Sequence, residues 1–206
     1  LNLRSLTLFA DKTYQSNRKC RPILGGREQE FSDEEILQLE KVHQALAIIQ
    51  FKLENQLIKR RPEFQMQDHV MLDKIDYWEE SVTIDDIKHP LVNTCFQTIN
   101  PENPSALTPE ENQAVDSMLA SFQSSLKMAE HLSLLMNKGS MYKIYNHHLL
   151  FHGCIPLEPS GEFQPFVLNQ AHYVGKELLD FFEYHIRQSA KNKEVGDDLS
   201  TDLIWY

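Results

Sequence analysis

Two helix start signals, each followed by a long run of regularly spaced apolar residues, constrain this chain more than any other feature. Ser32 and Glu35 have the spacing of a capping box, in which the N-cap hydroxyl and the third helical residue bond to each other's backbone. Pro62 cannot continue the helix, so it ends near Arg60 and is about 40 Å long at roughly 1.5 Å per residue. Its apolar stripe comprises Ile36, Leu39, Val42, Leu46, Ile49 and Leu53.

The second signal is Thr108-Pro109-Glu110-Glu111, with threonine as the N-cap, proline in the first turn and glutamate at the third helical position. The pattern predicts one helix that reaches Gly139, a typical C-terminal cap. Because acids in a first helical turn stabilise the helix, we interpret Glu34-Glu35 and Glu110-Glu111 as structural rather than catalytic carboxylate pairs. The buried stripe of this helix is expected at Val115, Leu119, Phe122, Leu126, Ala129 and Leu135.

The other expected elements are shorter. We expect the acidic side chains near the C-terminus to lie in solvent, namely those of Asp197, Asp198 and Asp202. The patterns predict helices over 2–14, 67–78 and 170–190, a small hairpin over 82–88, two strands within 141–154, loops over 16–30, 100–104 and 156–165, and a polar segment over 191–200. The predicted fold class is therefore mainly α (α+β).

Composition excludes several kinds of partner. The net charge of -10 argues against a nucleic-acid surface and against an anionic membrane, both of which attract lysine and arginine. A phosphorylated substrate therefore requires a metal or a local basic cluster. No apolar run approaches the length of a membrane span, and Cys20, Cys95 and Cys154 lack the spacing of a disulfide framework or a zinc site. These features favour a cytoplasmic protein with reduced thiols.

The segment from Tyr142 to Pro156 contains the best candidate for chemistry. It is expected to form two short strands around a polar turn, and the second strand ends in His152-Gly153. A glycine after a strand-terminal histidine allows backbone or ligand to approach closely. His147 and His148 are interpreted as turn residues, because adjacent strand residues face opposite ways and do not easily share an ion.

A basic cluster, Lys59-Arg60-Arg61, lies at the expected C-terminus of the long helix. Cations at this position interact favourably with the helix dipole, which is the interpretation we prefer. A contact with a substrate phosphate is the functional alternative.

The chain resembles the class III fructose-1,6-bisphosphatases of Firmicutes, metal-dependent phosphatases related to the calcineurin-like phosphoesterases. The resemblance covers nearly the whole sequence in order. It is carried by Leu1–Arg4, Ile48–Glu54, Lys59–Phe64, Leu72–Tyr77, Lys138–Lys143 and the segment that ends in His152-Gly153.

The resemblance implies that His152 is one metal ligand, that the metal is manganese, and that a metal-activated water attacks the phosphate. The family's other ligands lie in Asp-x-His, Gly-Asp-x-x-Asp-Arg, Gly-Asn-His-Asp and Gly-His-Thr segments, none of which occurs in these 206 residues. We therefore expect an internal fragment, inactive alone, with ligands before Leu1 and after Tyr206. Cys154 stands where the family's relatives usually have a second glycine.

In this interpretation, residues 1–138 are a helical insertion and residues 139–206 are a partial return to a catalytic αββα metallophosphatase sandwich. The implied activity is hydrolysis of the 1-phosphate of fructose 1,6-bisphosphate, a small phosphorylated sugar, in gluconeogenesis. The implied partners are the remaining parts of the parent chain, and a homo-oligomer is left open. The alternative is a non-catalytic helical interaction or regulatory domain, in which His152 is a core residue.

Overall fold

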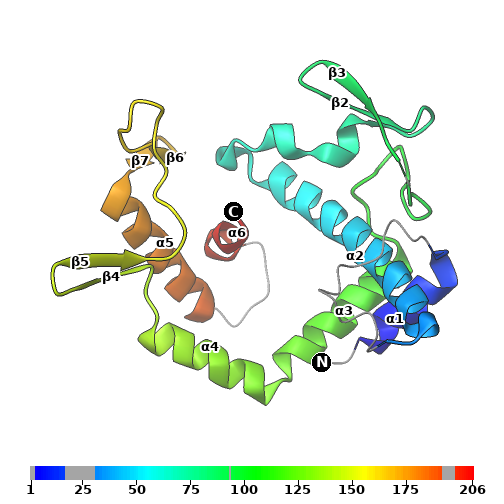
Figure 1. The fold of residues 1–206 in the computed structure, drawn as a ribbon, viewed down its shortest axis with the longest axis horizontal. Coiled ribbons are helices and arrows are strands. Elements are labelled where there is room, and N and C mark those ends of the chain that lie inside the picture. The colour runs from blue at the N-terminus through cyan, green and yellow to red at the C-terminus, as the bar shows by residue number, and fades with distance from the viewer. Residues whose placement is uncertain (1–2, 17–30, 93, 192–197) are drawn as a thin grey trace. The chain divides into compact units, whose positions relative to one another are not determined.

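The structure, a computed structural model, describes residues 3–16, 31–92, 94–191 and 198–206. These residues form two compact units, Leu1–Ser125 and Leu126–Tyr206 (Figure 1). The first unit is mostly helical, and the second combines helices with two small hairpins. The prediction of a mainly α chain with small antiparallel sheets is confirmed, and the largest sheet among the described residues has three strands.

Three helices build the first unit: α1 (Arg4–Thr13), α2 (Asp33–Arg60) and α3 (Pro109–Gln123). Both predicted capping boxes are present. The backbone N–H of Glu35 donates to the Ser32 hydroxyl at 3.3 Å, and the backbone N–H of Ser32 donates to the Glu35 carboxylate at 2.8 Å. The matching distances at Thr108 and Glu111 are 3.2 and 2.8 Å, so both predicted helix starts are confirmed.

The core of the first unit lies where these three helices meet. It takes side chains from one face of α1, from the middle of α2 and from the first half of α3. The buried members are Leu6, Phe9, Ala10, Tyr14, Ala45, Ile49 and Ala114. The predicted loop over 16–30 lies almost entirely outside the described residues.

The predicted helix over 67–78 is wrong. Short 3-10 turns stand there instead, η3 (Pro62–Phe64), η4 (Gln67–His69) and η5 (Met71–Lys74). They lead into a three-stranded antiparallel sheet of β1 (Ile75–Asp76), β2 (Ser81–Ile84) and β3 (Ile87–Pro90), which confirms the predicted hairpin. Ile75 pairs with Val82, so the end of the 67–78 segment becomes a strand of the sheet. This pairing outweighs the helical spacing of the apolar residues in the segment.

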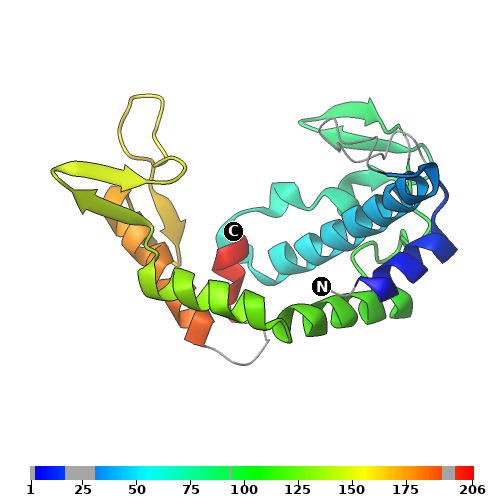
Figure 2. The ribbon, with the colours of Figure 1, turned by 60° about the horizontal axis from the view of Figure 1, so that its bottom comes forward.

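The second unit contains α4 (Leu126–Lys138), α5 (Gly175–Lys191) and α6 (Leu199–Trp205). Its two hairpins are β4 (Tyr142–Tyr145) with β5 (His148–Phe151), and β6 (Phe166–Leu168) with β7 (Ala171–Tyr173). Figure 2 shows both hairpins beside α5 from a second direction.

Helix boundaries in this region differ from the prediction. The single helix expected from Thr108 to Gly139 is interrupted at Ser124-Ser125, where the Ser124 hydroxyl donates to the Ser121 carbonyl and competes with the helical hydrogen-bond pattern. The helix expected from 170 begins only at Gly175, because residues 171–173 pair as a strand.

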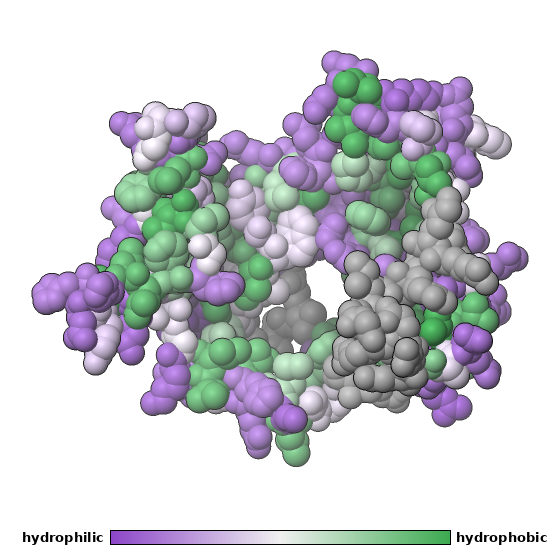
Figure 3. All heavy atoms as spheres, in the orientation of Figure 1, coloured by the Kyte–Doolittle hydropathy of each residue, from purple (hydrophilic) through white to green (hydrophobic). Residues whose placement is uncertain are grey.

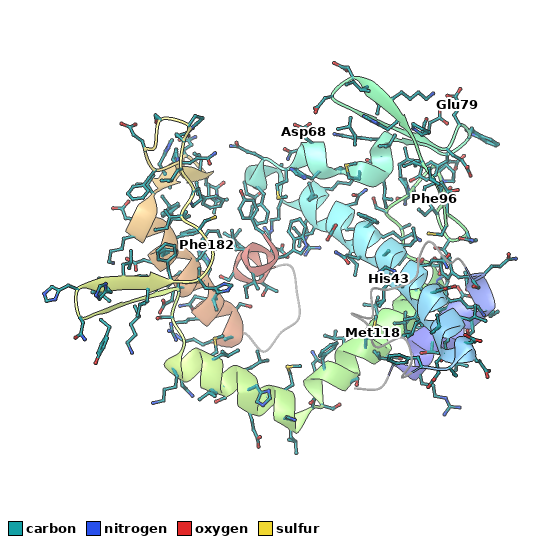
Figure 4. All side chains as sticks on the ribbon, in the orientation of Figure 1. His43, Asp68, Glu79, Phe96, Met118 and Phe182 are labelled. Atoms are coloured by element: carbon teal, nitrogen blue, oxygen red, sulfur yellow. The ribbon has the colours of Figure 1, made fainter. Side chains whose placement is uncertain are left out.

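Aromatic side chains hold the second unit together. Phe166 lies with its ring centroid 5.4 Å from that of Phe182, which Figure 4 labels on α5, and 5.0 Å from that of Tyr206. The rings of Tyr173 and Phe181 are 4.1 Å apart. The end of the chain is therefore packed against α5 and β6.

One predicted solvent-exposed acid is buried in this unit. Asp202 is only 2% exposed, which contradicts the prediction for it. Asp198 caps α6 by accepting the backbone N–H of Thr201 at 3.1 Å, whereas Asp197 lies outside the described residues.

Two elements of the second unit expose apolar faces. Helix α4 has no buried residue, although Leu126, Leu132, Leu134 and Leu135 lie on it. The β4–β5 hairpin likewise has no buried residue. Figure 3 shows hydrophobic residues, in green, at the surface along both elements. Because apolar surface gains free energy when it leaves water, these faces are candidates for coverage by further protein.

Candidate functional site

His152 directly follows β5 and its side chain is exposed. Gly153 has φ +88°, a left-handed conformation that glycine adopts without strain, and a Cβ added there would meet no atom within 4 Å. The glycine therefore turns the chain away from the strand and leaves the imidazole at its open end. The predicted strand that ends in His-Gly is confirmed, and the role of His152 as a metal ligand stays a prediction.

The turn that precedes this strand differs slightly from the prediction. Asn146 and His147 form the two-residue loop, with φ angles of +47° and +62° that match the turns favoured in tight hairpins. His148 is not a turn residue, because it is the first residue of β5 and pairs with Tyr145. His148 and His152 thus lie at opposite ends of one strand.

Helix α5 holds the base of the hairpin. The Glu183 carboxylate accepts the backbone N–H of Met141 at 2.9 Å, and the Tyr142 hydroxyl donates to Asp180 at 3.1 Å. The Met141 N–H, followed by the Arg187 guanidinium, lowers the pKa of Glu183 below its usual range. The charged form of Glu183 is therefore the form that fixes the hairpin.

Arg187 joins the end of α4 to the same network. Its guanidinium donates to the carbonyls of Met136 at 2.5 Å and Gly139 at 2.9 Å, and it pairs with Glu183 at 2.8 Å. Carbonyls in the last turn of a helix lack helical partners, so an arginine there satisfies groups that otherwise need water.

We expect Arg187→Met to loosen the hairpin that carries His152. The variant loses the hydrogen bonds to two helix-terminal carbonyls and the pair with Glu183, which together are worth about 1–2 kcal/mol after solvent screening. Faster amide hydrogen exchange at Met141 and within β4 would report the loss. Lys191→Met is the matched control, because Lys191 is an exposed residue at the end of the same helix, whereas Lys176 lies over the Tyr142 ring of β4. Equal exchange rates in both variants would contradict the anchoring role.

The described residues do not form a metal centre by themselves. No group of three or more histidine, cysteine, aspartate or glutamate side chains among them could hold a metal ion. His152 is an exposed imidazole without such neighbours, so it fits a role as one ligand among several. No catalytic step is derivable from this part of the chain alone.

The basic cluster at the end of α2 is engaged in local contacts. Lys59 pairs with Asp73 at 2.7 Å and donates to the Ser105 hydroxyl at 3.2 Å. The Arg61 guanidinium lies 3.7 Å from Glu63. Arg60 is the last residue of the helix and is exposed. These contacts agree with the structural interpretation of Lys59 and Arg61, and contact with a substrate phosphate stays untested.

Sequence reasoning missed a buried ion pair in the first unit. The Lys52 ammonium lies 2.7 Å from the Glu111 carboxylate, and both side chains are fully buried. Lys52 also donates to the Thr98 carbonyl at 2.7 Å, while the Thr98 hydroxyl donates to Glu111 at 2.6 Å. The Tyr14 hydroxyl lies 3.2 Å from that of Thr98, and burial raises the pKa of Tyr14 to about 12.

A signal for this pair exists in the sequence. Ile48, Lys52 and Asn55 share one face of α2 at spacings of four and three residues, and all three are buried. A lysine on a buried stripe requires a counter-charge. Its partner Glu111, however, looks like an ordinary capping residue, which it also is.

Cys95 and Cys154 are free thiols, and Cys20 lies outside the described residues. Across the described ranges, no helix combines the length and the apolar character that a membrane crossing needs.

Comparison with known proteins gives one consistent result. A family profile described as Firmicute fructose-1,6-bisphosphatase matches residues 1–206. The chain is 94% identical over 206 residues to the class 3 fructose-1,6-bisphosphatase of Streptococcus sanguinis strain SK36, and 81% identical to that of Streptococcus gordonii strain Challis. Over 211 aligned residues it is 46% identical to the class 3 fructose-1,6-bisphosphatase of Staphylococcus aureus strain Newman.

Each of these alignments covers 100% of this chain and 32% of the relative. The chain therefore spans about a third of the length of these curated relatives. No solved structure matches it.

Proposed function

Because this chain belongs to the family of Firmicute fructose-1,6-bisphosphatases, we propose that it forms part of an enzyme that removes the 1-phosphate of fructose 1,6-bisphosphate. Within that enzyme, residues 139–206 present His152 to the catalytic site, and residues 1–138 are a helical insertion. Manganese as the metal, gluconeogenesis as the pathway and the cytoplasm as the compartment belong to the same proposal.

The observation that carries the proposal is the position of His152. The imidazole stands at the open end of a strand, and Gly153 turns the backbone away from it. An exposed imidazole fixed by its own strand can join a ligand set that other segments complete. When bound, a divalent metal neutralises charge on a transferring phosphoryl group. The role proposed for this chain is to hold one imidazole nitrogen at a fixed place.

The β4–β5 hairpin has an apolar face that favours coverage by further protein. Tyr142, Ile144, Leu149 and Phe151 alternate along β4 and β5 and share one face, which is apolar and lacks any buried residue. An isolated two-stranded hairpin is marginally stable in water. We therefore propose that the β4–β5 hairpin joins a larger sheet supplied by the rest of the enzyme, as a metallophosphatase sandwich requires.

The proposal is tested by phosphate release from the full-length enzyme and from the 206-residue chain. We expect the full-length enzyme to release one phosphate per fructose 1,6-bisphosphate with manganese, to form fructose 6-phosphate, and to lose activity in a chelator. The 206-residue chain is expected to release none, because it brings one ligand candidate. If the full-length enzyme left fructose 1,6-bisphosphate intact, an interaction or regulatory role for the helices would be favoured instead.

A further inference from the structure

An apolar cavity lies in the first unit, whereas the hairpin that carries His152 belongs to the second unit. Its volume is about 310 Å³, and it lies between the middle of α2, the η5 turn with the start of the sheet, and residues 91–92 and 94–96. Ile48, Leu72 and Val82 form buried walls, at 4%, 2% and 7% exposure. Phe51 also lines the cavity but is 43% exposed, which places it at the mouth.

The chemistry of the walls excludes a sugar phosphate. Among the residues that the structure describes, no charged side chain lines the cavity. The described lining side chains with polar character are Thr94 and Cys95, and the Thr94 hydroxyl already donates to the Glu80 carboxylate at 2.7 Å. An anion placed here would lose its hydration without gaining a partner. A ligand without charge loses little and gains the removal of its apolar surface from water.

The walls are held apart by contacts that do not depend on a ligand. The Tyr77 hydroxyl donates to the Leu72 carbonyl at 2.8 Å, and the Tyr77 ring meets that of Phe96 edge to face at 5.1 Å. The backbone N–H of Leu91 donates to the Glu80 carbonyl at 2.7 Å. Figure 4 shows Phe96 on the segment between the sheet and α3. A cavity with walls fixed in this way does not close easily.

We propose that this cavity is a binding site for an uncharged apolar small molecule of about two aromatic rings. An apolar cavity of about 150 Å³ in another protein stays dry and binds benzene. The volume here is about twice as large, so a ligand of two rings matches it in size. The site is separate from the chemistry proposed for His152, and it gives the helical unit a binding function of its own.

The test uses the full-length enzyme and the neutral dye 6-propionyl-2-(dimethylamino)naphthalene, which has two fused aromatic rings and whose emission shifts to shorter wavelength in apolar surroundings. We expect saturable binding of one dye per chain. Ala47→Leu replaces a methyl group on the cavity wall with an isobutyl group and is expected to weaken binding at least tenfold. Gln50→Leu places the same isobutyl side chain at an exposed position of α2 that does not line the cavity, and it is expected to bind as the original does.

A second measurement keeps the test decisive if Ala47→Leu unfolds. Trp78 is 93% exposed, so Trp78→Phe leaves the core intact. It follows Ile75, a residue that lines the cavity, by three positions. We expect tryptophan-sensitised dye emission to fall in Trp78→Phe, because Trp78 belongs to the unit that holds the cavity.

Two results would overturn the site: dye affinity unchanged in a folded Ala47→Leu variant, or no saturable binding in the full-length enzyme. The latter would show that other protein fills the cavity. Dissociation of an oligomer as dye binds would likewise assign the cavity to a second copy.

Discussion

Replacement of His152 by alanine in the full-length enzyme is expected to lower phosphate release from fructose 1,6-bisphosphate by about a hundredfold or more. Metal-based stabilisation of a transferring phosphoryl group is worth several kcal/mol, and each 1.36 kcal/mol changes the rate tenfold. If His152 holds a metal, the alanine variant loses a ligand nitrogen, and the described residues contain no group of three or more metal-binding side chains that could hold the ion instead.

The fold is expected to tolerate this change. His152 is exposed and lies outside β5, so its removal leaves no buried cavity. The melting curve measured in a chelator should therefore match that of the original protein. Manganese affinity, measured by calorimetry, should fall together with activity, which distinguishes a ligand from a residue that only supports the strand.

His148→Ala is the matched control for this experiment. His148 is the same residue type at the other end of β5, is exposed, and lies about 13 Å along the chain from His152 at the usual rise of a strand. It should retain most activity and manganese affinity. Full activity in His152→Ala would remove the central claim about this residue. Loss of stability together with loss of activity would show that His152 is structural.

The parts of the fold that sequence predicted well are those decided by neighbours in the chain. The starts of α2 and α3 follow from side chains three residues apart, which bond to each other's backbone in any helix. The β4–β5 hairpin and the left-handed Gly153 are equally local. The candidate position of His152 was predictable because it depends only on where its own strand ends.

The failures involve contacts between distant segments. Residues 67–78 have helical spacing, but Ile75 pairs with Val82, and that pairing decides the local structure. The same holds at α5, which begins late because residues 171–173 pair with 166–168. The partners that complete a site at His152 stay unknown for the same reason, since periodicity does not say which distant side chains meet.

The buried pair of Lys52 and Glu111 is another contact between distant segments. Fifty-nine residues separate them, and neither is visible to solvent. We expect Lys52→Met to lower the free energy of unfolding of the first unit by about 3–5 kcal/mol, because it leaves a buried carboxylate without its counter-charge. Hydrogen exchange of α2 amides near Ile48 measures this in the unit concerned.

Comparison of Glu111 with Glu35 separates the effect of the buried ion pair from the effect of the capping contact. Glu35 and Glu111 both occupy the third position of a capping box, and glutamine also serves there, but Glu35 is exposed. Glu35→Gln should change stability little, whereas Glu111→Gln should destabilise the first unit because it leaves the Lys52 ammonium buried and unpaired. Equal effects at both positions would show that the capping contact alone accounts for Glu111.

The double variant Lys52→Met/Glu111→Gln decides whether the pair acts as a unit. It removes both charges at once and keeps an acceptor for the Thr108 N–H, so it should be more stable than Lys52→Met alone. Additive losses would mean that the two side chains contribute independently. Since Lys52 belongs to the Ile48–Glu54 segment, recovery in the double variant would assign that lysine to the architecture of the helical unit and not to its chemistry.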